Sequence, residues 1–290
     1  MVRQKAAVTL KPAKTNFMQD SAQPFLRWAG SKKKLLPKLS LFYDGKNERY
    51  VEPFVGSGTL FFKVRPKKAV LGDVNRELIS TYREVKYRLP GLLNELRKLK
   101  KSKRLYNELR KRDPRTMTRA ERAARFIYLN RFCFNGIYRT NLAGRFNVPY
   151  SGEKTGNLPT EEMLSKCARR LRNSKLIAGD FDETLKQVRV GDFVYMDPPF
   201  FVKRRRVFRE YQSTPFSTVD IARLRCWIEK LDKRGISFVV SYAKCKEAKD
   251  LARGFNVKQV SVNRSVAGFT ARRSRALELI ITNVAPKEES

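Results

Sequence analysis

The sequence predicts an α/β fold in which helices cover both faces of a mostly parallel sheet and a helical subdomain is inserted. Two observations lead to this fold. Short apolar runs with strand character alternate with segments of helical periodicity, which is typical of βαβ units. Between about residues 86 and 172 the strand-like runs stop, and basic segments with helical patterns take their place. The sheet is therefore expected to be built from residues 23–85 and 173–285.

The strands are predicted from β-branched and aromatic runs, the first four of which end near Gly, Asp or Pro. They are expected at 50–55, 69–71, 175–178, 193–196, 236–242, 257–262 and 276–282. Apolar spacings of three and four residues predict the helices between them, at 59–64, 76–89, 218–231 and 246–253. The insert should hold helices at 92–112, 119–131 and 160–171 and a loop at 132–156. Residues 1–22 are basic and aperiodic and are expected to form a flexible arm.

The composition favours a polyanionic partner. The 290 residues include 63 Lys and Arg against 28 Asp and Glu, a net charge of +35. Nucleic acid is the first expectation, because neutralising each phosphate releases counterions. An anionic membrane surface or a simply solvated basic face are the alternatives. No apolar run is long enough for a membrane helix, and the N-terminus lacks the apolar core of a secretory signal. The four cysteines form no CxxC motif, which fits a reducing, cytoplasmic setting.

The chain contains no histidine. Its absence excludes Ser-His and Cys-His nucleophilic catalysis, imidazole acid–base chemistry and His-ligated metal sites. Any reaction must therefore use carboxylates, backbone carbonyls, aromatic rings or a cofactor, and no metal is expected.

A glycine turn after the first predicted strand indicates a ligand site. Gly56 and Gly58 allow the backbone to approach a ligand closely, and ligands bind at the carboxyl ends of strands in open α/β sheets. Asp73, at the end of the next strand, can accept hydrogen bonds from both ribose hydroxyls of an adenosine. Because the third glycine of a dinucleotide-binding turn is missing, an ordinary βα turn is the alternative.

The segment 25–32 precedes the first strand and contains Trp28 and Lys32. The indole could cover an adenine or a sulfonium, with cationic side chains on either side of it. The alternative is a hydrophobic staple on an N-terminal helix.

The tetrapeptide Asp197-Pro198-Pro199-Phe200 follows another strand and carries the most chemistry. The two prolines hold the strand end extended and leave the Pro198 carbonyl free to accept a hydrogen bond. The Asp197 carboxylate and this carbonyl could bind the two hydrogens of an exocyclic amine, while Phe200 stacks on the base. The alternative is a simple stop at the end of the strand.

A base paired within a duplex must be flipped out to reach such a site. The loop 130–141 (NRFCFNGIYRTN) offers aromatic rings to fill the gap, amides for the orphan base and arginines for guanine edges. The same aromatic residues could instead form the core of the insert.

Together these motifs resemble the DNA adenine-N6 methyltransferases of the Dam type, a family of α-group amino-methyltransferases that use S-adenosylmethionine. The resemblance runs from about residue 25 to 282. It rests on RWAGSK (27–32), VEPFVGSG (51–58), GDVNRELIS (72–80), LNRFCFNGIYRTN (129–141), GRFNVPY (144–150) and DPPF (197–200). It implies a Rossmann-like methyltransferase sheet, with residues 86–172 as a helical subdomain that recognises the DNA target.

The resemblance also implies roles for individual residues. The cofactor would be bound by Trp28, Lys32, Glu52, Pro53, Phe54, Gly56, Gly58, Asp73, Asp180, Phe181 and Asp197, with Asp180 and Phe181 at its adenine moiety. The target adenine would be oriented by Asp197, Pro198, Pro199 and Phe200. The DNA would be contacted by Arg27, Arg131, Phe134, Asn135, Ile137, Arg139 and Asn141. Arg27 and Arg139 stand where GATC-specific members read guanines, and Phe134 and Asn135 where a ring inserts and an amide meets the orphan thymine.

Three positions depart from the usual pattern of the family. Phe200 and Phe134 replace tyrosines, and Arg27 replaces a lysine. The chemistry should be retained, whereas the recognised sequence is less firmly implied. The prediction is a site-specific adenine-N6 methyltransferase that acts on double-stranded DNA, in a GATC-like site, alongside a cognate restriction endonuclease. The alternatives are a cytosine-N4 methyltransferase, an RNA substrate, or a basic binding protein with an inactive Rossmann core.

Overall fold

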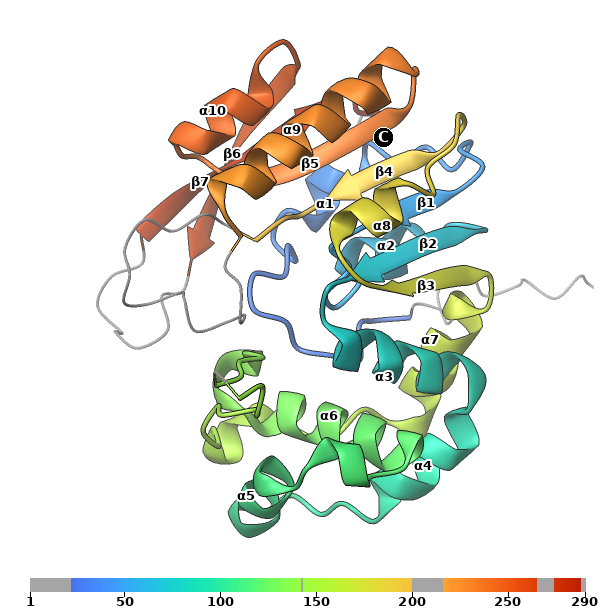
Figure 1. The fold of residues 1–290 in the computed structure, drawn as a ribbon, viewed down its shortest axis with the longest axis vertical. Coiled ribbons are helices and arrows are strands. Elements are labelled where there is room, and N and C mark those ends of the chain that lie inside the picture. The colour runs from blue at the N-terminus through green and yellow to red at the C-terminus, as the bar shows by residue number, and fades with distance from the viewer. Residues whose placement is uncertain (1–21, 142, 200–215, 265–273, 288–290) are drawn as a thin grey trace, which may run out of the picture.

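The computed structural model describes residues 22–141, 143–199, 216–264 and 274–287. Phe200 and nearly all of the predicted N-terminal arm lie outside these ranges. The α/β part of the molecule lies above a group of helices that come from the middle of the chain (Figure 1). Across the described ranges, none of the helices combines the length and apolar composition that a membrane span requires.

A mixed, mostly parallel sheet of seven strands confirms the predicted α/β fold. The strand order is β3-β2-β1-β4-β5-β7-β6, and only β7 runs antiparallel to its neighbours β5 and β6. The strands are β1 Tyr50–Glu52, β2 Ala69–Asp73, β3 Ser174–Ala178, β4 Phe193–Met196, β5 Ser237–Ala243, β6 Asn256–Arg264 and β7 Ser274–Thr282.

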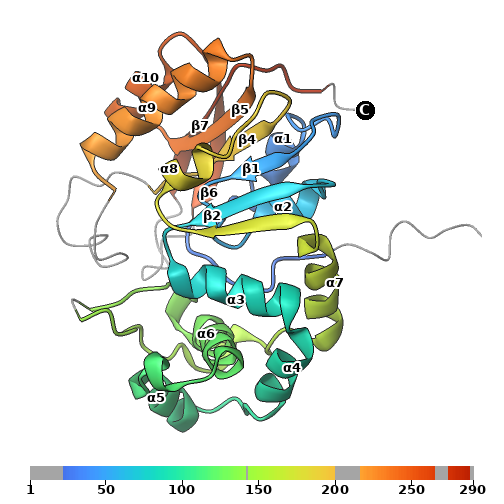
Figure 2. The same ribbon diagram turned by 45° about the vertical axis from the view of Figure 1, so that its right-hand side comes forward.

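Helices cover both faces of the sheet, as predicted (Figure 2). One face carries α1 Leu36–Ser40, α2 Thr59–Val64 and α3 Arg76–Tyr87, and the other carries α8 Phe181–Leu185, α9 Thr218–Lys233 and α10 Lys246–Ala252. Because side chains alternate along a strand, neighbouring residues serve different cores. Tyr195 packs with the α1–α3 face, whereas Val194 packs with the α8–α10 face.

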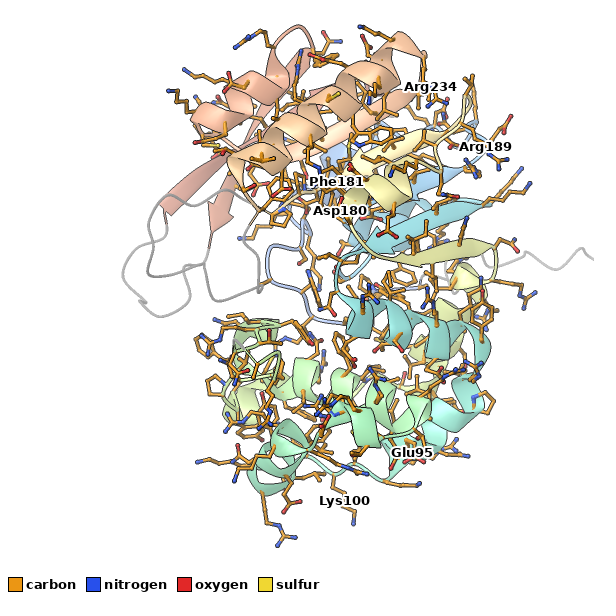
Figure 3. The ribbon with its side chains drawn as sticks, in the orientation of Figure 1. Glu95, Lys100, Asp180, Phe181, Arg189 and Arg234 are labelled. Atoms are coloured by element: carbon orange, nitrogen blue, oxygen red, sulfur yellow. The ribbon has the colours of Figure 1, made fainter. Side chains whose placement is uncertain are left out.

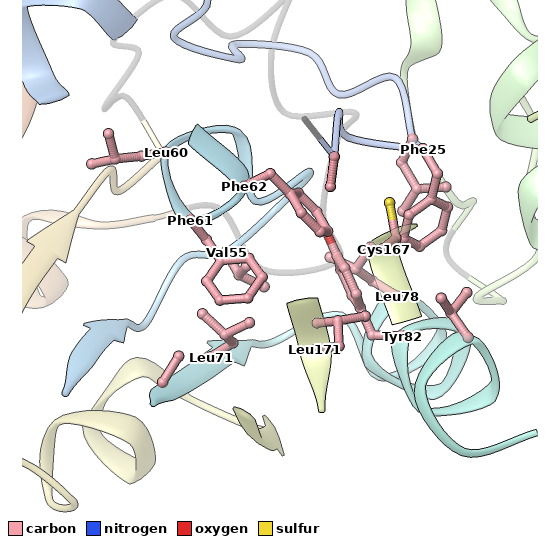
Figure 4. Packing of buried hydrophobic residues seen from close by; sticks show 14 of the residues in the cluster. Phe25, Val55, Leu60, Phe61, Phe62, Leu71, Leu78, Tyr82, Cys167 and Leu171 are labelled. Carbon is pink, nitrogen blue, oxygen red and sulfur yellow. The ribbon is translucent and has the colours of Figure 1, made fainter. Parts of the chain in front are cut away.

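The insert forms α4 Leu89–Arg97, α5 Lys103–Lys111, α6 Arg119–Phe132 and α7 Glu161–Leu171, with short 3-10 turns Pro114–Thr116, Phe134–Gly136 and Gly152–Thr155. It does not pack as a separate body. Helix α3 contacts β2 and β3 on one side and α6 and α7 on the other. Phe25, Tyr82 and Leu171 meet in one apolar cluster that joins the sheet to the insert (Figure 4).

Most predicted elements are present, but the single helix expected over 92–112 is wrong. The chain breaks into α4 and α5 because Ser102 caps α5, its hydroxyl accepting a hydrogen bond from the Leu105 amide at 3.0 Å. The Tyr128 hydroxyl of α6 donates to the Lys100 carbonyl at 2.9 Å and holds the turn. The five-residue helices α1 and α8 were not predicted, because one turn is too short to show periodicity.

Helix α8 packs closely against β2 at Gly72. A Cβ atom added to Gly72 would lie 1.9 Å from the Oγ1 of Thr184, which is fully buried. Gly72→Ala should therefore lower the free energy of unfolding by about 1–3 kcal/mol, measured by urea denaturation. Gly91→Ala in α4 is the matched control, since its nearest neighbour is 4.0 Å away. It should leave stability unchanged or raise it by up to about 1 kcal/mol. Equal effects of both substitutions would contradict this account.

Candidate active site

The predicted site residues gather where the order of the strands reverses. Strand β1 lies between β2 and β4. From β1 the chain adds β2 and β3 on one side and then crosses over to add β4 and β5 on the other side. Open α/β sheets bind ligands in the crevice at such a point, outside the carboxyl ends of the strands. The glycine turn follows β1, Asp73 ends β2 and Asp197 follows β4.

Asp73 organises the glycine turn. Its carboxylate accepts hydrogen bonds from the backbone N–H of Gly56 at 3.0 Å and of Asn75 at 2.9 Å. Gly56 and Gly58 have φ angles of 48° and 65°, and a Cβ on Gly56 would lie 2.7 Å from the indole of Trp28. The positive φ angles therefore favour glycine at both positions, and the contact with Trp28 leaves no room for a side chain at Gly56. Burial raises the pKa of Asp73 to about 6, even though the two amides oppose the shift.

Glu52 and Pro53 are buried beneath the glycine turn. The Glu52 carboxyl accepts a hydrogen bond from the Tyr50 hydroxyl at 2.9 Å. Burial raises the pKa of Glu52 well above its ordinary value, and the nearby carboxylates of Asp197 and Asp73 add to the shift. The floor of the site is thus acidic and would favour a cationic ligand.

Asp197 lies between a cation and a hydroxyl. Its Oδ1 atom is 2.8 Å from Lys32 Nζ and accepts a hydrogen bond from Ser241 at 2.9 Å. Burial raises the pKa of Asp197, while Lys32 and Ser241 oppose the shift. Pro198 is buried and Pro199 is exposed. Lys32 was predicted to face the cofactor, and the structure places its ammonium directly on the carboxylate of the tetrapeptide.

Three phenylalanines line another part of the same strand ends. The ring of Phe54 lies 5.4 Å from that of Phe181 and 6.0 Å from that of Phe216. Asp180 caps α8 beside Phe181 (Figure 3). Arg223 of α9 donates a hydrogen bond to Asp180 at 2.5 Å and covers the Phe181 ring at 4.5 Å. Asp180 and Phe181 are thereby held in place from α9, which the sequence did not indicate.

The loop 132–156 contains a hairpin whose two arms meet at Asn141 and Arg145, so that Phe134 and Asn135 lie at its base, next to the end of α6. Isolated β-bridges join Cys133 to Tyr150 and Thr140 to Phe146. Phe134 is 41% exposed, and Asn135 beside it has a strained φ of 54°. Phe132 and Phe146 are buried in the core of the insert, as the alternative interpretation of the loop aromatics expects, whereas Phe134 is not part of that core.

The remaining predicted DNA contacts lie around this hairpin. Arg139 donates to the Asn147 side chain at 2.7 Å, and the Asn141 side chain accepts from the Arg145 amide at 2.9 Å. Ile137 packs against the core of the insert. Burial and the charge of Arg27 lower the pKa of Arg131, so a nearby anion would be favourable there.

The hairpin is joined to the segment that carries Trp28 and Lys32. Asn130 accepts a hydrogen bond from the Arg27 amide at 2.9 Å and donates one to the Arg27 carbonyl at 2.6 Å. A Cβ on Gly136 would lie 2.6 Å from the Cβ of Arg27. Trp28 and Tyr138 stack, with ring centroids 6.3 Å apart and planes 16° apart. The base of the hairpin is therefore connected, through the segment 27–32, to the strand ends that carry Asp197.

Sequence reasoning missed several of these contacts. Asn130 and Tyr138 lie within the motif 129–141, but no local pattern shows that they hold Arg27 and Trp28. Ser241 and Glu278 come from strands far along the chain and reach the site only through strand pairing. Within the described ranges, no three Cys, Asp or Glu side chains are grouped so as to hold a metal ion.

Known proteins with similar sequences match this arrangement over most of the chain. The profile of the D12 class of N6 adenine-specific DNA methyltransferases matches residues 28–266. The chain belongs to this class. The type II methyltransferase M1.LlaDCHI of Lactococcus lactis subsp. cremoris is 36% identical over 270 residues, which are 90% of this chain and 95% of that protein.

Two further relatives show the same extent of similarity. The type II methyltransferase M.MjaIII of Methanocaldococcus jannaschii is 33% identical, over 90% of this chain and 99% of its own. The DNA adenine methylase of Escherichia coli K12 is 30% identical, over 88% and 93%. The enzyme is therefore an adenine-specific DNA methyltransferase that uses S-adenosylmethionine. This decides against the alternatives of cytosine-N4 methylation, an RNA substrate and an inactive binding protein.

The residues at the strand ends fit this cofactor. S-adenosylmethionine carries a positive sulfonium, which suits the acidic floor made by Glu52, Asp73 and Asp197. Gly56 and Gly58 keep the backbone of the turn free of side chains. Trp28, Phe54 and Phe181 supply apolar walls around this floor.

Replacing Asn130 should loosen the joint between the hairpin and the segment 27–32. Asn130→Ala removes both hydrogen bonds to the Arg27 backbone, and Asn130 is only 2% exposed. We expect the free energy of unfolding to fall by about 2–3 kcal/mol in urea denaturation. Asn94→Ala is the control, because Asn94 is exposed and its only side-chain hydrogen bond among the described residues is with Arg97. It should change stability by less than about 0.5 kcal/mol. A similar small change for Asn130→Ala would show that the joint is not needed.

Proposed function

We propose that this methyltransferase acts on an adenine flipped out of double-stranded DNA within a GATC-like site. The observation that carries the proposal is the position of Asp197 at the strand ends, beside Glu52 and Asp73 and fixed by Lys32. An amine that donates to the Asp197 carboxylate and the Pro198 carbonyl gains electron density on nitrogen. Bound S-adenosylmethionine supplies the electrophilic methyl group. The protein contributes position and electrostatics.

The cofactor residues are assigned in this proposal from their place in the site. Asp73 accepts from the ribose hydroxyls, Trp28 and the turn from Glu52 to Gly58 enclose the sulfonium, and Asp180 and Phe181 bind the adenine moiety. Lys32 acts through Asp197, because its ammonium contacts that carboxylate at 2.8 Å. Phe200 retains its proposed stacking role, although it lies outside the described residues.

The hairpin is assigned to the DNA. Phe134 is exposed at the base of the hairpin and is proposed to fill the gap left by the flipped adenine, with Asn135 at the orphan base. Arg27 and Arg139 are assigned to guanine edges. Arg131, Ile137 and Asn141 complete the contact, and the burial of the Arg131 guanidinium supports a phosphate as its partner. The net charge of +35 supports strong attraction to the duplex.

The relatives extend the proposal to the biological setting. Two of them are named type II methyltransferases, a term used for the modification enzymes of restriction systems. We infer a cognate restriction endonuclease that cuts the same site, and a cytoplasmic enzyme associated with DNA. Sequencing that maps N6-methyladenine after incubation with random-sequence DNA and S-adenosylmethionine should show modification at GATC. Modification at an unrelated sequence would overturn the assigned specificity while leaving the chemistry intact.

Asp197→Asn should lower the rate of methyl transfer at least about 100-fold, because the amide lacks the negative charge and presents an NH2 donor in place of one carboxylate oxygen. DNA affinity, measured by fluorescence anisotropy, should change little, since the proposed phosphate contacts lie on the insert. Asp250→Asn is the control, because this exposed carboxylate lies on α10, and Arg253 is its only ion-pair partner within the part of the chain that the structure describes. A substantial rate in Asp197→Asn would refute the role of the tetrapeptide. A melting curve shows whether the variant folds with Lys32 left unpaired by Asp197.

Binding of S-adenosylhomocysteine should depend on pH through Asp73. The pKa of this carboxyl is raised to about 6, so it is protonated below that pH and stabilises the free fold there. Ribose hydroxyls donate to the ionised form, so affinity should rise as pH increases. We expect binding about tenfold weaker at pH 5 than at pH 7.5 by isothermal titration calorimetry. Asp73→Asn should bind weakly and with less dependence on pH. An affinity that falls with rising pH would contradict the assignment.

A further inference from the structure

We propose that Ser241 and Tyr195 are positioning residues for methyl transfer. They form a buried chain of hydroxyls that, with Lys32, engages one carboxylate oxygen of Asp197 and leaves the other to accept a hydrogen bond from the adenine amine. This inference rests on the role proposed for Asp197, and extends it to residues that do not touch the substrate.

The contacts fix the direction of each hydrogen bond in the chain. Ser241 Oγ lies 2.9 Å from Asp197 Oδ1 and 2.9 Å from the Tyr195 hydroxyl. An ionised carboxylate only accepts, so the single hydroxyl hydrogen of Ser241 points to Asp197. Tyr195 must then donate to Ser241. The result is a chain Tyr195 to Ser241 to Asp197, in which every hydrogen is directed toward the carboxylate.

The sheet makes this chain rigid. Tyr195 of β4 pairs with Val239 of β5, and Ser241 lies two residues further along the same face. Tyr195 is 2% exposed and Ser241 is fully buried, so water does not compete for either hydroxyl. Asp197 follows β4 directly after Met196. The hydrogen bonds from Tyr195 through Ser241 to Asp197 therefore run between the ends of the adjacent strands β4 and β5, where little movement is allowed.

Lys32 holds the same oxygen from the other side. Its ammonium lies 2.8 Å from Asp197 Oδ1, 3.9 Å from Glu278 and 3.2 Å from the Gly30 carbonyl. Glu278 reaches this place because β7 pairs antiparallel with β5, opposite Ala243. Both donors to Asp197 thus meet at Oδ1, which orients Oδ2 as the atom for the substrate.

A buried serine and tyrosine could also be bonded only to satisfy their own hydroxyls. The two roles differ in what their removal changes. A structural role affects stability alone, whereas a positioning role affects turnover and its dependence on pH. Thr282 offers a matched comparison, because its hydroxyl is also buried between β5 and β7 and donates to the Phe238 carbonyl at 2.6 Å.

The test compares Ser241→Ala, Tyr195→Phe and Thr282→Val in the full-length enzyme with S-adenosylmethionine and duplex DNA. Ser241→Ala should lower kcat about 10- to 100-fold while KM for both substrates stays within about threefold. The acid limb of its kcat–pH profile should move to higher pH, since Ser241 lowers the pKa of Asp197. Tyr195→Phe should act in the same direction and less strongly. Thr282→Val should lower the melting temperature and leave kcat and the pH profile unchanged.

Unchanged kcat and an unchanged pH profile in Ser241→Ala would overturn the inference. A loss of rate in Thr282→Val that equals the loss in Ser241→Ala would also overturn it, because both losses would then reflect reduced stability of the fold. Asp197→Asn, assayed in parallel, separates the two proposals. If Asp197→Asn is inactive and Ser241→Ala is normal, only the positioning role fails. If Asp197→Asn is active, the proposed function fails and the inference fails with it.

Discussion

The ion pair between Lys32 and Asp197 is the contact on which the rest of the site depends. Both charges are largely withdrawn from water, at 7% and 19% side-chain exposure, so loss of either partner would leave the other poorly compensated. The pair ties the segment 27–32 to the end of β4. From this segment Trp28 reaches the glycine turn at Gly56, and Arg27 reaches the hairpin through Asn130. One charged contact therefore sets the spacing of cofactor turn, catalytic strand and hairpin.

The electrostatics of the molecule change sign between its surface and its site. The chain as a whole carries +35 charges, which suits a polyanion. The strand ends instead collect Glu52, Asp73, Asp197 and Glu278 around Lys32, and burial raises the pKa of Glu52 and Asp73. A basic exterior and an acidic interior fit the two substrates of the enzyme, which are an anionic duplex and a cationic methyl donor.

The sequence predicted the sheet and most helices because the strands are short apolar runs, the first four of which end in or run into Gly, Asp or Pro. It failed over 92–112, where the Ser102 cap and the Tyr128 hydroxyl end one helix and begin another. Contiguous motifs revealed Asp73 and the tetrapeptide. Ser241 and Glu278 had no such signal, since only the pairing of β5 with β7 brings them to the site. The partner of Lys32 was likewise set by tertiary packing, which local sequence does not encode.

The joint between the hairpin and the segment 27–32 constrains how this enzyme can be altered. Gly136 packs on Arg27 with no room for a Cβ, and Asn130 binds the backbone of the same residue on both sides. A hairpin grafted from a relative must therefore carry a glycine that matches Gly136 and follow a helix that keeps the Asn130 amide, or be transferred together with its own N-terminal segment. Exchange of the hairpin alone would leave its contacts with the segment 27–32 unmatched.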